Sequence, residues 1–119
     1  MEYLAGPYSY RGVGWTPEQN QVIEAARYQA HRKCCAELLL RGRCVYSPIV
    51  HGHNLLPELN AWSHQQWLDH DFKVLRVCSS VIVLKLEGWD VSKGVKMELD
   101  YARELGLPVM YLEEGEYPL

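Results

Sequence analysis

Apolar residues occur in four short runs along the chain, and each run has about the length of a β-strand. The strongest spans residues 79–86, which are mostly apolar and β-branched. Such runs are typical of strands that are covered on both faces of a sheet. Shorter runs lie at residues 3–5, 44–46 and 109–112. We therefore expect four strands.

Segments with helical spacing separate these strands. The first begins at Thr16, which can cap the helix, with Pro17 suited to the first turn and Gln19 completing a capping box. We expect this helix to end at Gly42. Its apolar stripe, at helical spacing, consists of Val22, Ile23, Ala26, Ala30, Cys34 and Leu38. Its polar face carries three basic residues that we expect to be solvated: Arg27, Arg32 and Lys33.

Two further helices follow. We expect one from residue 57 or 60 to about residue 76, and another from residue 92 to about residue 105. Residues 49–56 are expected to form a loop, because Ser47 and Pro48 stop the second strand. The acidic tail, residues 113–119, is expected to be loose unless a neighbouring subunit holds it.

The order of elements is therefore β-α-β-α-β-α-β. This alternation predicts a parallel sheet with right-handed crossovers and helices on both faces. We predict an α/β fold with one domain over residues 1–119. It is a three-layer, doubly wound arrangement with a mainly parallel four-stranded sheet, of the flavodoxin or Rossmann-like type.

The amino-acid composition argues against some classes of function. The chain has 119 residues, 48% of them hydrophobic and 23% charged, with a net charge of −3. This balance argues against a protein that binds nucleic-acid polymers, which normally carries a basic face. The first six residues lack a basic signal-peptide region, and no apolar run approaches the length of a membrane span, so we expect a cytoplasmic protein. The cysteines have no C-x-x-C spacing and are expected to be buried: Cys34, Cys35, Cys44 and Cys78.

Candidate chemistry gathers where such a sheet binds ligands, at the carboxyl ends of its strands. The loop after the first strand carries Tyr8 and Arg11, and the loop after the second carries His51 and His53. A His-x-His pair alone is a weak metal motif. We therefore predict no metal. A metal-dependent hydrolase that uses His51, His53 and Asp71 is kept as an alternative, ranked after the two functions given at the end of this section.

The strongest candidate site is the start of the last helix. Ser92 can cap it, and free backbone N–H groups at a helix start bind anions. Glu98 lies one turn after Gly94, and helical side chains lean toward the N-terminus. The Glu98 carboxylate could therefore reach a ligand held at the helix start. Asp71, which shares a helix face with Trp67, is a second acidic candidate.

Three segments together resemble a known superfamily. They are Tyr3-Leu4-Ala5-Gly6-Pro7-Tyr8, then Trp67 with Asp71, then Ser92-x-Gly94-x-x-x-Glu98. In order and spacing, they resemble the nucleoside 2-deoxyribosyltransferase-like superfamily. The run from residue 46 to residue 53 and the pattern Gly88-Trp89-x-x-Ser92-x-Gly94 look closest to its DUF1937 branch.

The resemblance implies roles for these residues. Glu98 would be a nucleophile toward C1′ of a deoxyribosyl group, Asp71 would assist the departing base, and Tyr3 would orient the glutamate. At the position of Ser92, nucleoside transferases tend to carry an acid, whereas 5′-monophosphate N-glycosidases carry a serine. Ser92 therefore favours a nucleotide with a 5′-phosphate.

We accordingly expect an N-glycosidase that acts on (deoxy)nucleoside 5′-monophosphates, or a transferase if a second base replaces water. Its partner would be a small-molecule nucleotide or nucleoside, with no cofactor and no membrane, and the resemblance implies a homo-oligomer. The alternative is a non-catalytic nucleotide-binding or sensing module of the same fold. The expected substrate-binding residues are Gly6, Tyr8, Arg11, His51, His53, Trp89, Ser92 and Gly94.

Overall fold

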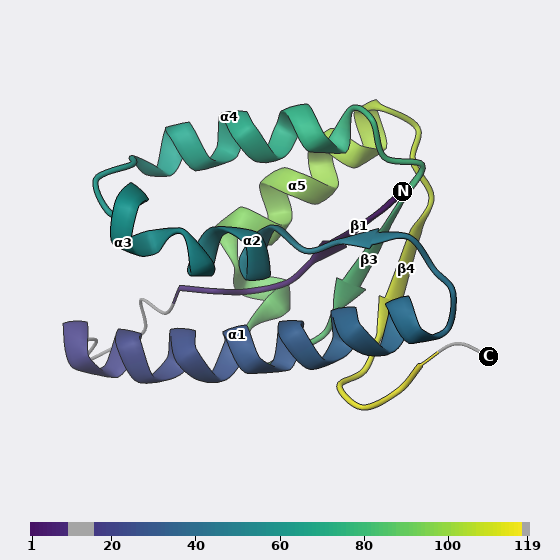
Figure 1. Cartoon of the computed structure of the whole chain (residues 1–119). Helices are drawn as coiled ribbons and strands as arrows, with labels where there is room; N and C mark the ends of the chain where they lie inside the picture. The colour runs from purple at the N-terminus through teal and green to yellow at the C-terminus, as the bar shows by residue number, and fades with distance from the viewer. Residues whose placement is uncertain (10–15, 118–119) are drawn as a thin grey trace.

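Four parallel strands lie at the centre of the molecule (Figure 1). The computed structural model describes residues 1–9 and 16–117. The strands follow the order β2-β1-β3-β4, and every pairing is parallel. Their bounds are β1 (Glu2–Ala5), β2 (Val45–Tyr46), β3 (Ser80–Leu84) and β4 (Val109–Leu112). The predicted α/β fold is confirmed, and the chain reverses its direction of winding between β1 and β3. This reversal is the position where doubly wound sheets bind ligands.

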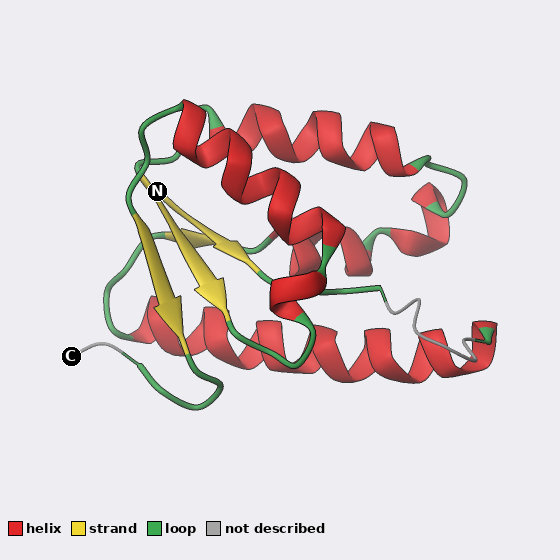
Figure 2. Ribbon diagram, turned by 180° about the vertical axis from the view of Figure 1, so that it is seen from behind, coloured by secondary structure: helices red, strands yellow, loops and turns green. Residues whose placement is uncertain are grey.

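Helices cover both faces of the sheet (Figure 2). Helix α1 (Pro17–Leu40) packs on one face, and α4 (His64–Leu75) and α5 (Lys93–Glu104) pack on the other. Because strand side chains alternate between faces, neighbouring residues of β1 enter different layers: Leu4 packs in the cluster beneath α1, and Tyr3 in the cluster beneath α4 and α5. The sheet thus separates two apolar cores.

Helix α1 begins as predicted, with the Thr16 hydroxyl accepting from the Gln19 N–H at 3.2 Å. Its predicted apolar stripe is only half correct. Cys34 and Leu38 are buried, whereas Val22 is 71% exposed. The helix has 24 residues, or about 36 Å of length, and the strands have at most five, or about 17 Å. The N-terminal half of α1 therefore extends beyond the sheet (Figure 1).

The segment predicted as a loop over residues 49–56 is helical instead. Helix α2 (Pro48–Asn54) is capped by Ser47, whose hydroxyl accepts from the Val50 N–H at 3.2 Å. The short α3 (Leu56–Leu59) follows, and α4 starts at His64, later than predicted. Pro48 is a helix starter here and not a strand terminator, because proline fits the first helical position.

The segment after β3 contains one further turn. After β3, a 3-10 turn η1 (Trp89–Val91) leads to Ser92, which caps α5 as predicted. The tail is less loose than expected: Lys85 pairs with Glu113 at 2.6 Å, and Arg41 lies 5.3 Å from the centre of the Tyr117 ring. Cys34 and Cys78 are buried, but Cys44 is exposed, contrary to the prediction. Across the described residues, no helix is both long and apolar enough to span a bilayer.

Candidate active site

A buried tyrosine–glutamate pair joins the sheet to α5. The Tyr3 hydroxyl donates a hydrogen bond to Oε2 of Glu98. Tyr3 is fully buried and Glu98 is 6% exposed. Glu98 lies on the inward face of α5, among Val95, Leu99 and Ala102. An ionisable group on an apolar helix face costs free energy of desolvation, and such groups concentrate at functional sites.

Asp71 brings a second carboxyl group to this pair from α4. Burial raises the pKa of Asp71 to about 7. Burial also raises the pKa of Glu98 to about 8, the Tyr3 hydrogen bond opposes that rise, and the charge of Asp71 adds to it. The two groups therefore exchange protons near neutral pH, which suits acid–base chemistry. Tyr3 itself has a strongly raised pKa, first through burial and then through the charges of Glu98 and Asp71, and so remains a hydrogen-bond donor.

The start of α5 is open beside this pair. The Ser92 hydroxyl accepts from the Val95 N–H at 3.3 Å. A side-chain carbon built at Gly94 would meet only the Ser92 hydroxyl oxygen within 4 Å among its described neighbours, at 3.9 Å. This space lies one helical turn before Glu98, as the sequence predicts. The helix start could therefore hold an anionic group close to the carboxylates.

The two histidines of α2 point to different surroundings. His51 lies 5.6 Å from Tyr46 and 5.7 Å from His70, measured between ring centroids. His53 accepts from or donates to the Tyr8 hydroxyl at 2.6 Å and stacks on Tyr28 at 4.0 Å. The described part of the chain contains no group of three or more side chains placed to hold a metal ion. His51 and His53 thus belong to separate clusters.

A row of aromatic rings continues from the carboxylates. We define the aromatic row as Tyr46, His51, His70 and Trp62. Tyr46 lies 6.3 Å from the Tyr3 ring, and its hydroxyl lies 3.4 Å from His70 Nε2. Trp62 lies 6.4 Å from His70. His70 and Trp62 were not predicted as site residues; the only sequence signal for His70 is its position beside Asp71.

Arg27 joins the loops that border the switch between β1 and β3. Its guanidinium donates to the carbonyl oxygens of Tyr8 at 3.3 Å, Ser9 at 2.8 Å and Glu87 at 2.9 Å. The prediction of a solvated Arg27 is therefore wrong. Helix α1 extends beyond the carboxyl ends of β1 and β3. It places Arg27 beside three carbonyl groups there that need hydrogen-bond donors.

His31 is a second residue of α1 that the sequence did not identify. It is fully buried, and its ring lies against Gly6, where an added side-chain carbon would come within 2.3 Å of His31 Cε1. The backbone of Pro7 is near, but neither ring nitrogen makes a well-formed hydrogen bond to a described residue. Burial lowers the pKa of His31 to about 4, so the ring is neutral. Gly6 therefore contributes space for His31 and not a demonstrated ligand contact.

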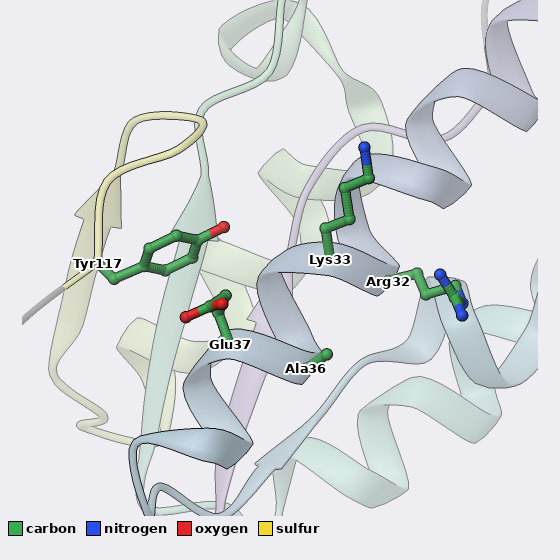
Figure 3. A pocket seen from close by; sticks show the side chains of 5 residues that line it. All are labelled: Arg32, Lys33, Ala36, Glu37 and Tyr117. Carbon is green, nitrogen blue, oxygen red and sulfur yellow. The ribbon is translucent and has the colours of Figure 1, made fainter.

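Trp89 lies against the apolar core that contains Tyr3 and Val95. Trp89 packs against Tyr111 of β4 at 5.5 Å, with Lys85 over its ring at 5.8 Å. Arg11 lies outside the described residues. A surface hollow lies elsewhere, between the outer side of α1 and the tail (Figure 3). It is lined by Arg32, Lys33, Ala36, Glu37 and Tyr117, and it contains none of the predicted site residues.

Comparison with known proteins identifies the family. The model of the family described as "Domain of unknown function (DUF1937)" matches residues 1–114. No curated protein matches the chain. The matched range includes every strand, Tyr3, Asp71 and Glu98. The chain therefore belongs to the DUF1937 family.

Proposed function

We propose that this protein cleaves the N-glycosidic bond of (deoxy)nucleoside 5′-monophosphates, with Glu98 as the nucleophile. The observation that carries this proposal is the buried Glu98 carboxylate, which accepts a hydrogen bond from Tyr3 and interacts with Asp71. The resemblance of these three residues to the nucleoside 2-deoxyribosyltransferase-like superfamily supports the same roles.

In the first step, a Glu98 oxygen forms a bond to C1′ while the N-glycosidic bond breaks. The electron pair of the broken bond moves to the base nitrogen, and protonated Asp71 donates its proton to the base. The transition state has oxocarbenium character, as in retaining glycosidases. Tyr3 holds the carboxylate in place and stabilises its charge.

In the second step, water attacks C1′ of the glycosyl ester. Asp71, now ionised, accepts a proton from this water, and the C1′–oxygen bond to Glu98 breaks. The products are the sugar 5-phosphate and free Glu98 carboxylate. A second base in place of water would transfer the sugar instead.

This sequence of steps requires one proton on the pair of carboxyl groups. Because burial raises the pKa of Asp71 to about 7 and that of Glu98 to about 8, the pair retains a proton near neutral pH. The pKa of Glu98 includes the Tyr3 hydrogen bond and still exceeds that of Asp71, so the ligand-free pair carries its shared proton on Glu98. In the reacting form this proton has moved to Asp71, and the Tyr3 hydrogen bond stabilises the charge that Glu98 then carries.

The start of α5 would hold the 5′-phosphate. Ser92 and the backbone N–H groups near Gly94 are the proposed contacts, and Arg11 is a further candidate. A carboxylate at the position of Ser92 would repel the phosphate, whereas a hydroxyl does not. This feature favours nucleotides over nucleosides.

Replacing Glu98 by glutamine tests the mechanism. Because the amide cannot attack C1′, release of free base from a panel of nucleoside 5′-monophosphates should fall by at least about a thousandfold. Glu104→Gln, an exposed change on the same helix, should leave the rate unchanged. Chromatographic detection of free base, with circular dichroism to verify folding, provides the measurement. Equal turnover in Glu98→Gln and the parent protein would overturn the proposed mechanism.

A non-catalytic nucleotide-binding module is the second candidate. The observation that favours it is the raised pKa of Glu98, about 8, which leaves the ligand-free carboxyl largely protonated at neutral pH. It predicts nucleotide binding without release of base, both in the parent protein and in Glu98→Gln.

We also propose that the protein forms a homo-oligomer, as the resemblance implies. Two exposed apolar residues near the open start of α5 support this: Val91 is 80% exposed and Met97 is 40% exposed. Light scattering of the parent protein and of Val91→Asp would test whether this surface is an interface. A monomeric parent protein would contradict it.

A further inference from the structure

The aromatic row lies between α2 and α4 and is partly open to solvent. Trp62 belongs to neither apolar core, His51 is exposed, and Trp62 and His70 are half-buried. Only Tyr46 packs against the core beneath α4 and α5. Polar aromatic rings that lie side by side and remain partly open to solvent are available to contact a ligand.

The row extends from the carboxylates to the surface. Its inner end, Tyr46, lies 6.3 Å from the Tyr3 ring, and Tyr3 binds Glu98. The charge of Asp71 reaches Tyr46 and contributes to raising its pKa to about 12, after the larger effect of burial. The outer members, His51 and Trp62, come from α2 and from the segment before α4. A flat ligand could therefore contact these rings while another part of it lies at Glu98.

Close helix packing holds the two histidines together. Gly52 of α2 is buried against Trp67 of α4, where an added side-chain carbon would lie 3.2 Å from the Trp67 ring. Trp67 in turn contacts Trp62 at 4.9 Å. This approach brings the His51 and His70 rings to 5.7 Å with only 16° between their planes. The row is thus built by the contact between α2 and α4.

The chemistry of the row suits an uncharged heteroaromatic ring. Aromatic and imidazole faces stack on nucleobases with little dependence on sequence, because every base has a π-face. Burial, and then the neighbouring His51 and Lys73, lower the pKa of His70, which favours its neutral ring. The histidine nitrogens and the Tyr46 hydroxyl can also bond to polar edges of a base.

We propose that the aromatic row is the subsite for the leaving nucleobase, with His51 and His70 contacting its ring. This inference rests on the proposed function for its choice of ligand. Of the expected substrate-binding residues, it includes His51 but not His53, which is paired with Tyr8 and Tyr28, nor Trp89, which packs on β4.

Binding to a cleavage-deficient protein tests the subsite separately from the chemistry. In the Glu98→Gln background, the four common deoxynucleoside 5′-monophosphates and base-free deoxyribose 5-phosphate are titrated by calorimetry. Adding His51→Ala and His70→Ala to this background should lower the affinity for the best-bound nucleotide by about tenfold or more, because stacking is lost. Affinity for deoxyribose 5-phosphate should stay within about twofold, since it has no base.

Matched variants separate stacking from folding. His64 is exposed and lies at the start of α4, the helix that carries His70. His64→Ala should leave nucleotide affinity unchanged. His51→Phe with His70→Phe should retain most of the affinity, because phenylalanine preserves a stacking face. The subsite is overturned if no nucleotide binds more tightly than deoxyribose 5-phosphate, if the alanine variants bind nucleotides normally, or if they lose both ligands equally. Base-dependent binding that the alanine variants lose, with no turnover in the parent protein, would support the subsite and contradict the proposed function.

Discussion

At the scale of single residues, the contact between Gly6 and His31 leaves no room for a larger side chain at Gly6. Gly6 directly follows β1, close to the point where the winding reverses between β1 and β3. A side-chain carbon at Gly6 would lie 2.3 Å from His31 Cε1 and 3.3 Å from the Leu84 carbonyl oxygen. His31 is fully buried and cannot move aside freely. Gly6→Ala should therefore lower the free energy of unfolding by about 1–3 kcal/mol, measured by urea denaturation.

A second change separates this clash from a general effect of alanine. His31→Ala should relieve the clash, so that Gly6→Ala costs at least about 1 kcal/mol less in that background. Gly94→Ala is the matched control, because its new side-chain carbon has open space and alanine favours helix by up to about 1 kcal/mol. Independent, additive effects of the Gly6 and His31 changes would contradict this account.

At the scale of elements, Arg27 makes α1 a brace between two loops. One planar guanidinium binds carbonyl oxygens from the loop after β1 and from the segment after β3. Lysine keeps the charge but lacks the fork that spans three acceptors. Arg27→Lys should lower the free energy of unfolding by about 1–2 kcal/mol and raise amide hydrogen exchange at residues 6–9 and 85–89.

Arg32→Lys is the matched control for the brace, because Arg32 is exposed on the same helix. It should change neither the free energy of unfolding nor exchange in these two segments. Exchange that rises equally along α5 in Arg27→Lys would indicate global unfolding and not a local brace.

At the scale of the whole molecule, the buried carboxyl groups make stability depend on pH. Folding raises the pKa of Glu98 from 4.5 to about 8, so the unfolded chain releases this proton first as the pH rises. The contribution of the Glu98 proton to the free energy of unfolding is therefore fully present below about pH 4.5. It is lost as the pH rises toward about 8. Glu98→Gln removes this loss, and should raise Tm at pH 9 on the order of 5 °C above that of the parent protein.

The sign of this effect can be checked at a second pH. Near pH 4, where the carboxyl group is protonated in both states, Glu98→Gln and the parent protein should unfold at similar temperatures. Glu104→Gln should show no such dependence, because Glu104 is exposed. A Glu98→Gln protein that is less stable than the parent at pH 9 would show that Glu98 is not destabilising when ionised.

Local sequence signals were sufficient wherever the chain's own neighbours decide the structure. The capping box at Thr16, the apolar run of β3 and the serine at the start of α5 depend on residues within one turn or strand, and they were predictable. Helix α2 was missed because Pro48 and Gly52 usually interrupt regular structure. Here, Pro48 occupies a first turn, and Gly52 faces the Trp67 ring from a different helix.

The sequence by itself determined the alternation of strands and helices, and hence the parallel sheet and the edge where its loops meet. It also selected Tyr3, Asp71 and Glu98 as candidates. Only the tertiary structure decided that Tyr3 binds Glu98, that Arg27 braces two loops, and that His51 and His53 separate while His51 meets His70. The reason is physical: helix periodicity and capping act over a few residues, whereas burial, pKa and side-chain contact depend on groups as many as 95 positions apart.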